Sequence, residues 1–143
     1  MNVELQFPAT PDNACQHAAL AVELARREFD LSLDYSPGSL EALDGQIEWM
    51  REQGLSGEDV AESLFALGCY MGEVLVRGLG GRWIPTLSSR LRGVSPWSIV
   101  VVLPGSATWD PIGKTFKRLE LGDSEFLPAF YAEAVASVQG TGA

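Results

Sequence analysis

Apolar positions recur at helical spacing through the first eighty residues of the chain. An alanine-rich pattern predicts a helix from Asp12 to Phe29, with Asp12 as its cap. A second helix is predicted after Ser36-Pro37 and ends at about Gln53. Its apolar side chains share one stripe: Leu40, Leu43, Ile47 and Met50. A third helix begins at Ser56-Gly57-Glu58-Asp59 and carries the widest apolar stripe, so we expect it at the centre of the fold.

Glycines end this helical pattern at Gly78, and the composition then changes to residues typical of strands. Arg82 to Leu87 and Ser98 to Leu103 are predicted strands, and Thr108-Trp109 is a short third one. A short helix from Asp110-Pro111 to about Leu119 and a last helix from Asp123-Ser124 to about Val138 complete the chain.

These elements predict an α+β fold that is mainly helical, with about five helices packed on a small antiparallel sheet of two or three strands. At 143 residues the chain has the length of one domain, residues 1–143. Within it we expect an acidic helical part at 12–79, a sheet part at 80–110 and C-terminal helices at 111–139.

The net charge of −9 is unevenly distributed along the chain. Residues 1–76 contain 14 acidic and 3 basic side chains, whereas residues 77–118 contain 7 basic and 1 acidic side chain. An acidic chain repels phosphate backbones and anionic membranes, so we expect neither nucleic acid nor membrane as a partner. Two interpretations remain: the acidic and basic parts stabilise each other within the fold, or the acidic helix faces attract a basic protein.

The second interpretation places this attraction on the acidic faces of the second and third predicted helices, and its candidate residues are four carboxylates of the second. They are placed largely off its apolar stripe: Glu41, Asp44, Glu48 and Glu52. On this interpretation they form a solvated face that steers a basic partner.

Residues for catalysis or metal binding are scarce. The chain has one histidine, His17, and two cysteines, Cys15 and Cys69, which cannot complete a catalytic triad or a four-ligand zinc site. We expect His17 to be packed or solvated, and both cysteines to be buried thiols. Gly113-Lys114-Thr115 lacks the glycine spacing of a phosphate-binding loop. The sequence therefore predicts a protein that is not an enzyme and has no cofactor or metal.

The sequence lacks both a secretory signal pattern and an apolar run long enough to cross a membrane. We therefore expect a cytoplasmic protein.

The most distinctive segment is 68–83. Gly68 and Gly72 lie one helical turn apart and so predict a close approach by another backbone. Glu73 and Arg77 have the spacing of a favourable ion pair. One interpretation is a tight helix crossing with a structural ion pair. The other is a binding pocket beside Asp34 and Tyr35, lined by Tyr70, Glu73 and Arg77. We expect Trp83, just after the glycines, to lie in the core.

Several short patterns together resemble a family of small bacterial proteins of unknown function. The match runs from about residue 29 to residue 131 and rests on three pieces: Leu33-Asp34-Tyr35-Ser36-Pro37-x-Ser39-Leu40-x-x-Leu43-Asp44; Gly68-x-Tyr70-x-Gly72-Glu73-Val74 with Arg77 and Gly80-Gly81-x-Trp83; and Lys117-Arg118-Leu119. This resemblance implies a bacterial α+β domain and supplies no catalytic residues. A looser similarity to immunity proteins of polymorphic toxins implies a neutralising role.

From these observations we expect a non-enzymatic protein-binding module, with an immunity protein that neutralises a basic toxin or enzyme as its specific form. The alternative is a small-molecule-binding protein or an enzyme with a pocket at Tyr70, Glu73 and Arg77. Self-association into a homodimer is a further alternative. The candidate binding residues are Asp34, Tyr35, Glu41, Asp44, Glu48, Glu52, Tyr70, Glu73, Arg77 and Trp83.

Overall fold

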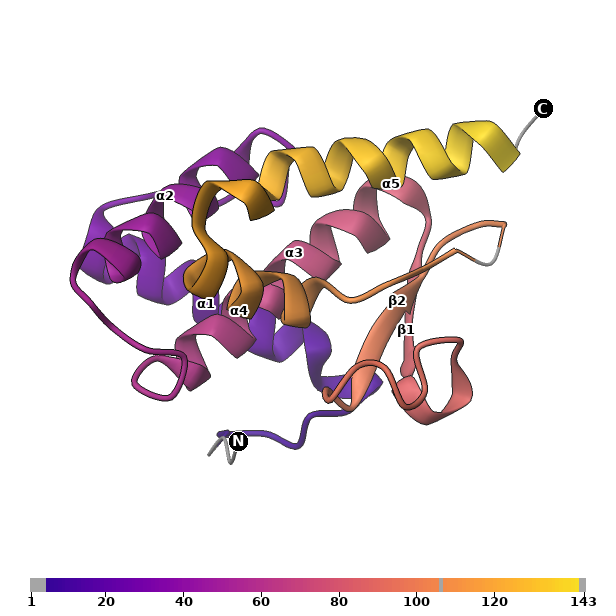
Figure 1. Cartoon of the computed structure of the whole chain (residues 1–143), viewed down its shortest axis with the longest axis horizontal. Coiled ribbons are helices and arrows are strands. Elements are labelled where there is room, and N and C mark those ends of the chain that lie inside the picture. The colour runs from indigo at the N-terminus through magenta and orange to yellow at the C-terminus, as the bar shows by residue number, and fades with distance from the viewer. Residues whose placement is uncertain (1–4, 106, 142–143) are drawn as a thin grey trace.

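A computed structural model describes residues 5–105 and 107–141 and confirms the predicted α+β, mainly helical fold (Figure 1). In the described residues, five α-helices pack on one antiparallel sheet of three strands in the order β1-β2-β3. The α-helices are α1 (Ala14–Phe29), α2 (Ser39–Glu52), α3 (Ala61–Leu79), α4 (Pro111–Leu121) and α5 (Leu127–Thr141). The strands are β1 (Arg82–Pro85), β2 (Ile99–Val102) and β3 (Thr108–Trp109), and the 3-10 helices are η1 (Pro11–Asn13), η2 (Thr86–Ser88) and η3 (Gly122–Glu125).

Helix α3 forms the centre of the fold, as its wide apolar stripe predicts. Every residue from 64 to 75 is buried, and Figure 1 shows α3 passing through the middle of the molecule beneath α5. Helix α1 packs against α3 and buries four small side chains: Ala14, Ala18, Ala21 and Ala25. On another side, a Cβ at Gly68 would lie 2.5 Å from the Cα of Ile112. Gly68 therefore allows α4 to cross α3 closely, which confirms the predicted tight crossing at this position.

The sheet places two tryptophans on either side of one central valine. Val101 of β2 is paired with Trp83 of β1 and with Trp109 of β3, so these three side chains share one face. Strand β1 is shorter than the predicted 82–87 segment, because the chain turns into η2 after Pro85. As a result Leu87 is 73% exposed and does not join the sheet.

Two helix ends follow the local sequence, and two do not. Asp110 caps α4 as predicted: its carboxylate accepts a hydrogen bond of 2.9 Å from the Gly113 N–H. Gly54 has a φ of +73° just after α2, as expected of a residue that ends a helix. The predicted cap at Asp12 is wrong, because Asp12 lies within η1 and α1 begins after it. The last helix begins at Leu127, later than predicted, because η3 occupies the preceding residues.

Candidate functional site

Within the distinctive segment 68–83, the side chains of Glu73, Arg77 and Trp83 contact one another. The Glu73 carboxylate is buried on α3, where Oε2 accepts a hydrogen bond of 2.9 Å from Trp83 Nε1. Its Oε1 lies 3.4 Å from a guanidinium nitrogen of Arg77, one helical turn further along, which confirms the predicted ion pair. Both carboxylate oxygens of Glu73 therefore have partners within the fold.

Gly72 makes room for an aromatic ring rather than for another backbone. A Cβ at this position would overlap the six-membered ring of Trp83. Without a side chain at position 72, the indole can approach α3 closely enough to reach Glu73. The expectation of a close backbone approach holds for Gly68 and is wrong for Gly72.

A second part of this cluster joins the loop before α2 to α3. The Tyr70 hydroxyl accepts a hydrogen bond of 2.8 Å from the Tyr35 N–H and lies 2.6 Å from Ser39 Oγ. The rings of Tyr35 and Tyr70 stack with centroids 4.7 Å apart, and the Arg77 guanidinium lies 3.7 Å above the Tyr35 ring. Burial raises the pKa of both tyrosines above the ordinary value, so both phenols remain protonated near neutral pH.

Asp34 forms its hydrogen bonds within its own turn. It is exposed, and its carboxylate accepts hydrogen bonds from the side chain and the backbone N–H of Ser36. These bonds lower the pKa of Asp34. Asp34 thus stabilises the turn in which Tyr35 adopts a φ of +63°. The Asp34 carboxylate is therefore engaged by Ser36, and a pocket beside it stays a prediction.

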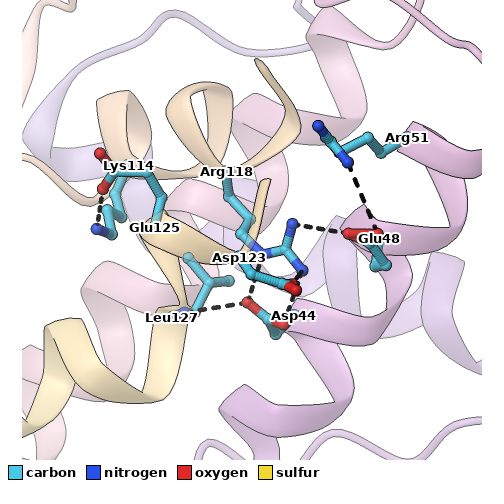
Figure 2. A network of polar contacts seen from close by, with 8 residues as sticks. All are labelled: Asp44, Glu48, Arg51, Lys114, Arg118, Asp123, Glu125 and Leu127. Atoms are coloured by element: carbon cyan, nitrogen blue, oxygen red, sulfur yellow. Dashed lines mark hydrogen bonds and ion pairs between the residues drawn. The ribbon is translucent and has the colours of Figure 1, made fainter. Parts of the chain in front are cut away.

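The four carboxylates predicted on the exposed face of α2 have different surroundings. Glu41 and Glu52 are exposed, but Asp44 is only 6% exposed and Glu48 is partly buried. Both bind Arg118 of α4, whose side chain is 1% exposed (Figure 2). The placement of Asp44 on a solvated face is therefore wrong. Its spacing of four from Leu40 and three from Ile47 puts it on the buried stripe.

Arg118 is the centre of this polar network. Its Nε lies 2.8 Å from Asp44 Oδ1, a second nitrogen lies 2.9 Å from Glu48, and a third lies 3.2 Å from both Asp44 Oδ2 and Asp123 (Figure 2). Burial alone would lower the pKa of Arg118, but the hydrogen bonds to Asp44 and Glu48 outweigh it and raise the pKa. Acidic and basic parts of the chain thus stabilise each other here, as the first interpretation of the charge pattern predicts.

Asp44 also binds the beginning of α5. Its Oδ1 accepts a hydrogen bond of 3.0 Å from the Leu127 N–H (Figure 2). The first N–H groups of a helix have no partner within that helix, so a carboxylate from α2 supplies one here. One buried aspartate therefore fixes both α4 and α5 on α2.

His17 and the cysteines have no arrangement suited to nucleophilic catalysis. His17 is packed, as expected, with a ring nitrogen 3.1 Å from the Pro8 carbonyl oxygen and its ring edge-to-face with Phe65. Burial raises the pKa of the Cys69 thiol, which keeps it protonated. Cys15 is exposed, so the prediction that it is buried is wrong. Its sulfur lies 3.7 Å from an Arg77 nitrogen.

An open groove of about 1100 Å³ adjoins the Arg118 network at Arg51, which lines the groove and lies 3.9 Å from Glu48. It is bounded by the loop after α2, the loop before β2 and one side of α4; in Figure 1 both loops lie below α4, one to each side. Its lining is mainly apolar, and its apolar side chains are Leu55, Leu91, Val94, Pro96, Trp97, Phe116 and Leu119. Trp97 and Phe116 stack with centroids 4.5 Å apart, and Trp97 also meets the core residue Phe65.

Val94 lines this groove and is 75% exposed. Sequence reasoning missed the groove because its two loops have no periodic pattern. The available signal was the presence of Leu91 and Val94 in a loop of arginine, serine and glycine residues. Apolar residues in such a loop have no strand or helix that would bury them.

The chain was compared with protein families, curated proteins and solved structures. No known family, curated protein or solved structure matches this chain. In the described residues, histidine, cysteine, aspartate and glutamate side chains do not gather in groups of three or more that could hold a metal ion. Nor does any helix in this part of the chain combine the length and apolar character needed to cross a membrane.

Proposed function

We propose that this chain is a non-enzymatic protein-binding module that receives part of its partner in the groove beside α4. The supporting observation is Val94, 75% exposed at the edge of a hollow lined by Leu91, Trp97 and Phe116. Exposed aliphatic side chains that continue an apolar groove are typical of surfaces that another protein covers. Neutralisation of a toxin or enzyme, which the resemblance to immunity proteins implies, is the specific form of this proposal.

A protein partner suits this groove better than a small ligand. Ligand pockets commonly enclose most of the surface of the molecule they bind. This groove is open, and its lining residue Val94 is 75% exposed, so a small molecule inside the groove would leave much of Val94 in water. A polypeptide segment can fill the hollow and cover the edge together.

The acidic face of α2 is a weaker candidate surface. Of its four carboxylates, Asp44 and Glu48 bind Arg118, which leaves Glu41 and Glu52 as exposed charges. A basic partner attracted to this face would therefore meet two carboxylates rather than four. The groove does not depend on these residues.

A small-molecule site or active site at Tyr70, Glu73 and Arg77 is the alternative. Its support is the exposed Arg77 side chain, 45% accessible and stacked on Tyr35. A ligand there would have to compete with Trp83 and Arg77 for the Glu73 carboxylate. We therefore rank it below the groove.

Affinity capture from a native lysate with three variants tests the proposal. Val94→Asp places a charge at the edge of the groove, and Leu87→Asp is its matched control, since Leu87 is 73% exposed and does not line the groove. The Glu41→Gln/Glu52→Gln variant removes the exposed acidic charges of α2. Circular dichroism establishes that each variant is folded.

We expect Val94→Asp to lose a partner that the other two variants retain. Retention by all three variants would place binding elsewhere and contradict the proposal. Loss only in the Glu41→Gln/Glu52→Gln variant would favour the acidic face and a basic partner.

A further inference from the structure

We infer that the segment bound in the groove is apolar and carries a lysine or arginine, which lies at the end of the groove where Glu58 and Glu120 stand. This inference rests on the proposed function and specifies the chemistry of the partner. The reason is that these two lining carboxylates have no partner within the described residues, whereas the other charged lining residues do.

Five charged side chains line the groove: Arg51, Glu58, Asp110, Lys117 and Glu120. Two of them are already used within the fold. The Asp110 carboxylate accepts a hydrogen bond from the Gly113 N–H at the beginning of α4, where a helix carries partial positive charge. Arg51 lies 3.9 Å from Glu48, and a Cβ at Gly122 would lie 3.0 Å from its guanidinium carbon. Its charge is therefore shared between a carboxylate and the partially negative end of α4.

Glu58 and Glu120 are the lining carboxylates left free. Both are exposed, and within the described residues neither forms a hydrogen bond or an ion pair. The remaining lining cation is Lys117, and its charge also acts outside the groove. The pKa of Glu125 is lowered by its hydrogen bond from Lys114 and also by the charge of Lys117. An incoming segment thus meets two free carboxylates and one shared cation.

The two free carboxylates lie toward the same end of the groove. Thr115 Oγ1 of α4 donates a hydrogen bond to the Leu64 carbonyl oxygen of α3, and Gly68 of α3 lies against Ile112 of α4. Residue numbers therefore rise along α3 as they fall along α4, so the two helices run antiparallel. One free carboxylate comes three residues before α3 and the other is in the last turn of α4. The beginning of α3 and the end of α4 meet, which gives the groove an acidic end.

Other charges near the groove are of both signs and do not line it. The Asp59 carboxylate accepts a hydrogen bond of 2.8 Å from the N–H of the lining residue Ser56. The exposed Arg90 and Arg92 are sequence neighbours of the lining residue Leu91. At physiological salt, charges interact over about 8 Å, so the charges that a segment contacts directly decide its preference. The net charge of −9 of the whole chain also favours a basic partner.

The lining residues of α4 set the length and spacing of the segment. They recur along one stripe from Asp110 to Glu120, which is roughly 15 Å along the helix axis. An extended segment of about five residues or a helix of about ten spans this length. Phe116, stacked on Trp97, lies four residues before Glu120, or about 6 Å. A segment that packs an apolar side chain on this stack therefore needs its cation two residues away if extended, or one turn away if helical.

A second copy of this chain fits the groove less well than such a segment. It would bring a net charge of −9, and like net charges oppose association.

A displayed library of random peptides of about twelve residues, selected on the whole native protein, tests the inference. We expect the enriched peptides to combine leucine, isoleucine or phenylalanine with lysine or arginine. Fluorescence anisotropy then gives the affinity of one such peptide for wild type and variants. Val94→Asn removes an apolar contact of the groove without adding a charge and should weaken binding by roughly fivefold or more.

Two further variants change the lining charges in opposite directions. Glu58→Gln/Glu120→Gln removes the free carboxylates and should weaken binding by roughly tenfold at low salt. It should also make the affinity less dependent on salt concentration. Lys117→Gln removes the lining cation and should strengthen binding by about two- to threefold. Weaker binding to the Lys117→Gln variant would contradict the inference.

The control for charge is Glu41→Gln/Glu52→Gln on α2, where both carboxylates are exposed and outside the groove. It changes the net charge of the protein by the same amount as the Glu58→Gln/Glu120→Gln variant. We expect less than about a twofold change in affinity. Equal losses in both variants would mean that net charge alone attracts the peptide, and the inference would be wrong.

The outcomes separate the inference from the proposed function. Enriched peptides that are acidic or uncharged, and that Val94→Asn weakens, would overturn the basic partner and leave the groove as a binding site. Peptides insensitive to Val94→Asn, or the absence of enriched peptides, would overturn both. A concentration-dependent dimer in analytical ultracentrifugation that Val94→Asn converts to a monomer would assign the groove to a second copy and overturn the inference.

Discussion

Arg118 donates hydrogen bonds to both carboxylate oxygens of Asp44, 74 positions earlier in the chain, at 2.8 and 3.2 Å. The two residues come from α4 and α2, and both are buried (Figure 2). A buried guanidinium requires such partners, because burial removes its hydration and only hydrogen bonds and opposite charges within the fold offset that cost in free energy. The pair therefore fixes the angle and position at which α4 meets α2.

Removing Arg118 should destabilise the fold strongly. Arg118→Met leaves Asp44 buried without its cation, and we expect a loss of about 3–5 kcal/mol in the free energy of unfolding, measured by urea denaturation. The Asp44→Asn/Arg118→Met double variant should recover part of this loss. Asparagine carries no charge and still offers an oxygen to the Leu127 N–H.

Arg51→Met is the matched control for this prediction. Arg51 also approaches Glu48, at 3.9 Å, but its side chain is 45% exposed, so the change should stay within about 0.5 kcal/mol. Equal losses for Arg51→Met and Arg118→Met would show that burial of the ion pair is not the cause.

Alanine substitution at two helical glycines should change the stability of the fold in opposite directions. At Gly72 the added methyl group would overlap the Trp83 ring, so Gly72→Ala should destabilise by about 1–3 kcal/mol. At Gly45 of α2 nothing lies within 4 Å of an added Cβ, so Gly45→Ala should stabilise by about 0.5–1 kcal/mol through helix propensity. Thermal denaturation of the two variants compares them directly, and stabilisation by Gly72→Ala would contradict the packing of Trp83 on α3.

The stability contributed by Glu125 should depend on pH. A hydrogen bond from Lys114 holds the pKa of Glu125 below its ordinary value of 4.5. Because the pKa of Glu125 is lower in the folded state, its ionised carboxylate contributes fully to the free energy of unfolding above the pKa that Glu125 has in the unfolded chain. This contribution is lost as the pH falls through the lower pKa of the folded chain.

Glu125→Gln should therefore be less stable than wild type at pH 7, by about 1 kcal/mol or less because both side chains are partly accessible. The difference should disappear in acid. Urea denaturation at a series of pH values measures it. A difference that stays constant down to acidic pH would mean that Glu125 acts through packing rather than charge.

Gln46 offers a route to a more stable protein. Its side chain is buried on α2, and within the described residues neither its amide nitrogen nor its amide oxygen has a hydrogen-bond partner. An unsatisfied buried amide costs free energy, so Gln46→Met should stabilise the fold by about 1 kcal/mol. Gln53→Met, at an exposed position, is the control and should change stability by less than about 0.5 kcal/mol. A lower melting temperature for Gln46→Met alone would indicate that the amide is bonded after all.

Local features of the sequence predicted much of the fold. Helix α3 follows from its apolar stripe, the beginning of α4 from the cap at Asp110, and the Glu73–Arg77 pair from a spacing of four. Each depends on residues within one or two turns, where helical geometry fixes which side chains meet.

Contacts between distant segments were harder to predict. The partners of Arg118 depend on how α2 and α4 cross, which no local spacing determines. A partial signal existed: Asp44 and Arg118 both lie on the apolar stripe of their helix, and two opposite charges at buried positions indicate a pair. The groove left a weaker signal, the apolar Leu91 and Val94 in a polar loop, because loops without periodicity form two of its sides.

The bond between Asp44 and Leu127 extends the effect of this pair to the last helix. Asp44 contacts α4 through its charge, which pairs with Arg118, and α5 through an oxygen atom, which accepts a hydrogen bond from the Leu127 N–H. In evolutionary terms, positions 44 and 118 should therefore change together. A homologue that has lost the arginine should carry an uncharged residue at 44, and an asparagine or serine there would keep the contact with α5.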